Sequence, residues 1–61
     1  MTTNEMMQKQ IKAEAVITRL EFMRDNGLDM TIVKFKDFTE VDKAECVVLI
    51  NERIVVLGGG A

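Results

Sequence analysis

The sequence predicts an α+β domain in which one long N-terminal helix packs on a small three-stranded antiparallel sheet that ends in a C-terminal hairpin. Three observations lead to this fold class. Residues 4–26 contain no Pro or Gly and carry apolar side chains at helical spacing. Residues 30–36 are rich in β-branched side chains, and residues 45–58 hold two apolar runs separated by Asn51-Glu52. The order helix, strand, strand, strand then places the helix across one face of the sheet.

The long helix, expected over residues 4–26, has the clearest end signals. Thr2 and Glu5 have the spacing of a capping box, in which the threonine side chain accepts from the backbone and the glutamate reaches back. A start one or two residues later is equally allowed. The pair Asn26-Gly27 supplies the stop, because its glycine can adopt the left-handed conformation that follows many helix ends.

A strand at residues 30–36 and a polar connection at residues 37–44 come next in the prediction. The strand alternates in polarity over its latter half, as a half-buried strand does. The connection has room for one helical turn capped by Thr39. Phe38 and Val41 are its expected anchors to the core.

Strands at residues 45–50 and 53–58 are expected to form the hairpin. Asn51-Glu52 would be a two-residue turn, but glutamate is a poor choice for its second position, so a four-residue loop stays open as an alternative. The glycines that follow end regular structure, and residues 59–61 are expected to be a flexible tail.

The chain is short for an independently stable fold. Its 61 residues allow a single domain, residues 1–61, and a chain of this size buries only about 60% of the surface that it exposes when unfolded. A disulfide within one copy is excluded because Cys46 is the only cysteine, and a zinc site is disfavoured because there is no His. Oligomerisation is the remaining way to stabilise the fold.

Two predicted elements carry more apolar surface than one copy can bury. A continuous helix has a core-facing stripe that includes Leu20 and a second apolar face that includes Ile11 and Phe22. Both faces of the expected hairpin are apolar, whereas one helix covers only one of them. The alternative is that the second helix face holds scattered surface residues. The expected interface consists of the following residues: Met7, Ile11, Ala15, Phe22, Val48, Ile50 and Val55.

The sequence shows no constellation of residues that indicates catalysis or metal binding, so no catalytic residue, cofactor or metal ligand is predicted. The acidic residues of the connection, Asp37 and Glu40 among them, fit no calcium loop and are expected to be solvated. Cys46 has an acidic neighbour rather than a cationic one and is expected to be a small buried hydrophobe. Gly58–Gly60 is followed by no helix that would complete a phosphate-binding loop.

These observations favour a non-enzymatic protein–protein interaction module that self-associates, with a dimer as the first expectation, and that binds a protein partner. The alternative is a dimeric nucleic-acid-binding regulator that uses Lys34, Lys36 and Arg53, although the net charge of −2 disfavours it. No export signal or membrane span is expected, and a lone thiol favours the cytoplasm. The size is typical of small bacterial or phage accessory proteins.

Overall fold

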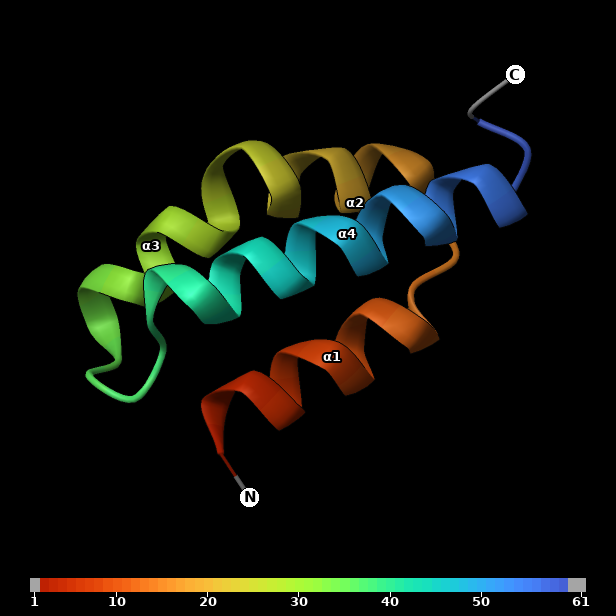
Figure 1. The fold of residues 1–61 in the computed structure, drawn as a ribbon. Helices are drawn as coiled ribbons and strands as arrows, with labels where there is room; N and C mark the ends of the chain where they lie inside the picture. Colours follow the sequence, from red (N-terminus) through yellow and green to blue (C-terminus); the bar gives the residue numbers. More distant parts are fainter. Residues whose placement is uncertain (1, 60–61) are drawn as a thin grey trace.

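The computed structural model describes residues 2–59, and all regular structure in that range is helical (Figure 1). The predicted α+β fold is therefore wrong, since residues 2–59 contain no strand. Helix α4 lies between α1 on one side and a rod formed by α2, η1 and α3 on the other. The elements are α1 (Thr3–Ala13), α2 (Ile17–Phe22), the π-helical turn η1 (Met23–Gly27), α3 (Leu28–Lys34) and α4 (Glu40–Val56).

The predicted capping box at the start of α1 is confirmed. The Glu5 N–H donates to Thr2 Oγ1 at 3.1 Å, and the Thr2 N–H donates to Glu5 Oε1 at 3.4 Å. The expected continuous helix over residues 4–26 is wrong, because the backbone is extended at Glu14 and at Val16.

The interruption has a clear physical reason in the core. Ile11 and Leu20 are nine residues apart, so a continuous helix would point them about 180° away from each other. In the structure both side chains are fully buried in the same core. The break at residues 14–16 turns the chain so that the Ile11 side of α1 and the Leu20 side of α2 meet one core.

The predicted stop at Gly27 is also wrong, because the chain stays helical through this residue as far as Lys34. The Leu28 N–H donates to the Met23 carbonyl five residues back, which is the bond of a π turn. A π turn holds about one residue more than an α turn. Leu28 follows Leu20 by eight residues, but the extra residue in the π turn makes this spacing equivalent to seven residues, or nearly two turns, of an α-helix. The two leucines therefore point to the same side, and both are buried.

The predicted strand at residues 30–36 is replaced by α3 and the extended residue that follows it. Thr31, Ile32 and Val33 are β-branched but helical, and Ile32 packs against the core. The Thr31 hydroxyl donates to the Gly27 carbonyl at 2.9 Å, four residues back. Packing on α4 thus overrides the local preference for a strand.

The predicted hairpin, with strands at residues 45–50 and 53–58, is replaced by the single helix α4. Asn51-Glu52, the expected turn, lies within this helix. The helix begins with a capping box, in which the Asp42 N–H donates to Thr39 Oγ1 at 3.3 Å. Cys46, Ile50 and Ile54 recur every four residues and are all buried, so they form the inner face of one helix, whereas Val48 and Val55 are exposed on its other side.

The C-terminal end of α4 is closed by a Schellman motif. Gly58 has a φ of +91°, and its N–H donates to the Val55 carbonyl at 3.0 Å. The Gly59 N–H donates to the Ile54 carbonyl at 2.9 Å. Gly59, the first residue of the expected flexible tail, thus belongs to the cap, and residues 60–61 lie outside the described residues.

The core lies along the inner face of α4. The molecule has extents of 35 × 21 × 16 Å, and side chains on the opposite face of α4 are exposed. The buried side chains of this core are those of Ile11, Leu20, Leu28, Phe38, Cys46, Ile50 and Ile54.

Candidate interaction surface

The uncovered face of α4 carries a row of valines. Val41, Val48 and Val55 follow one another at seven-residue spacing, which is nearly two turns, so they lie on one side of the helix. Their exposed fractions are 68%, 56% and 63%. Ala44 lies between the first two of them and is also exposed. We call these four residues the outer stripe, and they lie opposite the buried row of Cys46, Ile50 and Ile54.

The charges on the exposed side of α4 are acidic. Glu40, Glu45 and Glu52 are all exposed on this helix. The two cations of α4 are engaged elsewhere: Lys43 pairs with Asp29 of α3, and Arg53 Nε donates to the Glu14 carbonyl at 2.9 Å. The hydrogen bond that Lys43 Nζ donates to the Asp29 carboxylate raises the pKa of Lys43. The outer stripe is therefore apolar with acidic flanks.

The structure scatters the residues of the expected interface. Ile11 and Ile50 are buried in the chain's own core, and Met7 packs against that core. Ala15 is exposed in the break between α1 and α2, and Phe22 is exposed on α2. Only the remaining two, Val48 and Val55, belong to the outer stripe.

Two members of the outer stripe, Val41 and Ala44, were missed by the sequence reasoning. Phe38 is buried, which confirms its predicted role as an anchor, but Val41 is exposed and does not anchor the connection. The signal that identifies Val41 is the regular seven-residue spacing from Val41 to Val48 and from Val48 to Val55. That spacing has meaning only once the segment is known to be helical.

The residues of the nucleic-acid alternative are not brought together. Lys34 ends α3 and Lys36 precedes α4, whereas Arg53 lies near the other end of α4. From Glu40 to Arg53 the helix rises about 20 Å, at about 1.5 Å per residue. Arg53 is also held by the Glu14 carbonyl. The three cations therefore form no common patch.

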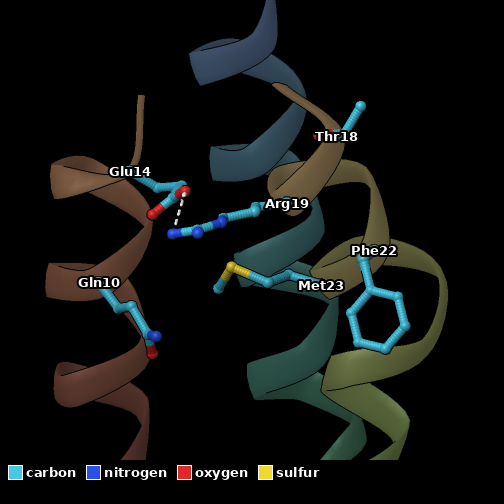
Figure 2. A pocket seen from close by; sticks show the side chains of 6 residues that line it. All are labelled: Gln10, Glu14, Thr18, Arg19, Phe22 and Met23. Carbon is cyan, nitrogen blue, oxygen red and sulfur yellow. Dashed lines mark ion pairs between the residues drawn. The ribbon is translucent and has the colours of Figure 1, made fainter. Parts of the chain in front are cut away.

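A second feature is an open pocket of about 350 Å³ between α1 and α2 (Figure 2). Glu14 and Arg19 point toward each other across it, with 3.8 Å between Glu14 Oε1 and an Arg19 guanidinium nitrogen. Glu14 Oε1 has no hydrogen-bond partner among the described residues. The lining residues are Gln10, Glu14, Thr18, Arg19, Phe22 and Met23.

A small polar cluster between α1 and α4 lies on one side of Cys46. Asn4 Nδ2 donates to Asp42 Oδ1 at 3.0 Å and lies 3.4 Å from Glu45 Oε2, while Asn4 Oδ1 accepts from Cys46 Sγ at 3.6 Å. Burial raises the pKa of the Cys46 thiol, and the charges of Asp42 and Glu45 raise it further. The thiol is therefore kept protonated and buried, which confirms its predicted role as a small hydrophobe.

Asp37, expected to be solvated, is exposed but bonded. Its carboxylate accepts from the Thr3 N–H at 3.1 Å and from the Thr3 hydroxyl at 2.6 Å. These bonds lower the pKa of Asp37 and tie the start of α1 to the segment before α4. Within residues 2–59 there is no group of three or more His, Cys, Asp or Glu side chains that is placed to hold a metal ion.

Comparisons with protein-family models, with curated proteins and with solved structures found no match to this chain. None of the helices in the described part of the chain has the length and apolarity needed to cross a bilayer. The outer stripe is an exposed apolar row along α4, the longest helix of the described residues.

Proposed function

We propose that the protein is a non-enzymatic protein–protein interaction module whose outer stripe binds an amphipathic helix of a protein partner. The observation that supports this most directly is the heptad spacing of Val41, Val48 and Val55 on an exposed helix face. A seven-residue apolar repeat is the pattern that a second helix packs against. The proposal also includes self-association and a cytoplasmic location. The free thiol of Cys46 supports that location.

The size of the outer stripe suits a transient interaction. Covering the exposed parts of three valines contributes about 3 kcal/mol before the costs of association are subtracted. This gain is too small for an obligate interface, so the flanking charges have to contribute to affinity and to the choice of partner.

The acidic flanks favour a basic partner over a second copy of the same face. An antiparallel pair of two such faces would bring Glu45 of one copy close to Glu52 of the other, and like charges at these positions are destabilising. A parallel pair would bring no cation of α4 to these glutamates, since Lys43 and Arg53 are engaged on other sides of the helix. We therefore assign to the outer stripe a partner helix with apolar heptad positions and lysine or arginine beside them.

Two synthetic three-heptad peptides test this assignment. Both carry leucine at the core positions, and the flanking positions hold lysine in one peptide and glutamate in the other. In an NMR titration of the isotope-labelled protein, we expect the lysine peptide to shift the resonances of Val41, Val48 and Val55. The glutamate peptide should bind at least about tenfold more weakly because it meets like charges.

Two matched variants locate the binding site. Val48→Glu places a charge in the centre of the outer stripe and should weaken binding of the lysine peptide by about tenfold or more. Val33→Glu places the same charge at an exposed position on α3 and should leave the affinity unchanged. Equal losses in the two variants, or resonance shifts confined to other helices, would contradict the proposal.

A further inference from the structure

Two of the three residues in the break between α1 and α2, Glu14 and Ala15, favour a helix. Glu14, Ala15 and Val16 include no Gly or Pro, and alanine and glutamate are among the stronger helix formers. Val16 occupies the N-cap position of α2, where its side chain accepts no hydrogen bond from the backbone. Nothing local in the sequence therefore stops the helix here.

Tertiary contacts keep the break in place instead. The Arg53 side chain holds the Glu14 carbonyl at 2.9 Å. Ile11 and Leu20, on either side of the break, are buried in the same core. The Glu14–Arg19 pair adds little, because its charged atoms are 3.8 Å apart and the Arg19 side chain is 74% exposed.

Straightening the break would change which surface α1 can reach. With a helix running from Thr3 to Lys34, the Leu20 face would stay on its own α4, whereas the Ile11 face would point about 180° away from it. The α1 site on α4 would then be empty. The surface that matches the Ile11 face of α1 is this same site on a second copy of the chain.

The α1 site is specific as well as apolar. Asn4 donates to Asp42, and the Thr3 N–H and hydroxyl donate to Asp37. The donors on α1 and the acceptors at its site both belong to this chain, so a second copy offers the same acceptors. Ile11 lies over α4 beside Leu49 and Arg53. An exchanged α1 would restore these helix-to-helix contacts between copies, and a reciprocal exchange closes into a two-fold symmetric dimer.

We propose that two copies of this protein exchange α1 across a straightened break at residues 14–16 and so form a domain-swapped dimer. This deepens the self-association part of the proposed function. The exchange leaves the outer stripe uncovered, so Val48→Glu should not alter the dimer. The partner-binding proposal and the exchange can therefore fail separately.

Opposite changes at Val16 test the exchange, since this residue is 45% exposed and lies outside the core. Val16→Asp gives α2 an N-cap, which should shift the equilibrium between the bent and the straight segment about fivefold toward the bent form in each copy. Because the dimer contains two such segments, its Kd should rise about 25-fold. Val16→Ala should shift the same equilibrium about threefold toward the straight helix in each copy, so the dimer Kd should fall about tenfold. Light scattering over a concentration series measures both, and an equal Kd in the two variants would overturn the proposal.

A disulfide reports which copy supplies α1. Asn4 contacts the only cysteine of the chain, Cys46, so Asn4→Cys provides a pair that spans the α1–α4 contact. After oxidation at high protein concentration, a non-reducing gel should show a covalent dimer, and its share should rise with Val16→Ala and fall with Val16→Asp. Disulfides confined to single chains, in a sample that light scattering shows to be dimeric, would assign the dimer to another surface and refute the exchange.

Discussion

Gly59 fits its position because it has no side chain. A Cβ atom added there would lie 2.8 Å from Ile17 Cδ1 and 3.0 Å from Ile54 Cγ2. At this glycine the C-terminal cap of α4 packs directly against Ile17, the first residue of α2. Gly27 differs, because the nearest atom to an added Cβ is 3.8 Å away and the residue is helical.

The two glycines should therefore respond in opposite directions to the same substitution. Gly59→Ala should lower the free energy of unfolding by about 1–3 kcal/mol, the usual cost of overpacking. Gly27→Ala should raise it by up to about 1 kcal/mol, because alanine is the better helix former. Urea denaturation followed by circular dichroism measures both, and a loss at Gly27 as large as that at Gly59 would contradict the packing argument.

At the scale of the element, α4 depends on its first turn. This helix contains five Val and two Ile, which are weak helix formers, so the capping box at Thr39 and Asp42 compensates for an unfavourable composition. Thr39→Ala should lower the free energy of unfolding by about 1 kcal/mol. Thr18→Ala, at an exposed position in the first turn of α2, should change it by less than about 0.5 kcal/mol. The urea midpoints of the two variants provide the comparison, and equal midpoints would show that the Thr39 cap is dispensable.

Local sequence was sufficient to predict the start of α1 but not the helix α4. The capping box at Thr2 depends on residues three positions apart, so local spacing was sufficient to find it. In α4 the β-branched residues favoured a strand locally, whereas the four-residue spacing of Cys46, Ile50 and Ile54 favours a helix. Packing on α1, α2 and α3 decides between the two patterns, and a local preference contains no information about that packing.

The break at residues 14–16 and the outer stripe were harder to predict for related reasons. The break follows from the need of Ile11 and Leu20 to share one core, which is a property of the assembled fold. Val48 and Val55 were assigned to the two strands of the expected hairpin and Val41 to a connection, so the three valines were not placed on one helix. The outer stripe becomes visible only when all three valines belong to α4.

At the scale of the whole molecule, Asp37 joins residues that are far apart in the chain. Its bonds to Thr3 span 34 positions and connect the start of α1 to the segment between α3 and α4. These bonds lower the pKa of the Asp37 carboxyl group relative to the unfolded chain. Their contribution to stability is therefore fully present above the unfolded pKa, which is about 3.9. It is lost as the pH falls through the lower pKa of the folded state.

A pH series of urea denaturation should reveal this contribution. In the native protein the urea midpoint should fall as the pH is lowered below about 4, and Asp37→Asn should flatten this dependence while lowering the midpoint at pH 7. Glu40→Gln, which neutralises an exposed acid in the first turn of α4, serves as the control and should keep the slope. If Asp37→Asn retained the full acid dependence, other carboxylates would have to be its source.

The central position of α4 also has a consequence for biosynthesis. The helices that pack on α4 precede it in the chain, so they leave the ribosome before the surface that they bury against exists. Until then Ile11, Leu20 and Leu28 have no partner helix, and helices as short as α1 are marginal in isolation. Folding of this segment must therefore wait for translation of α4, and the growing polypeptide exposes its apolar residues to chaperones during that interval.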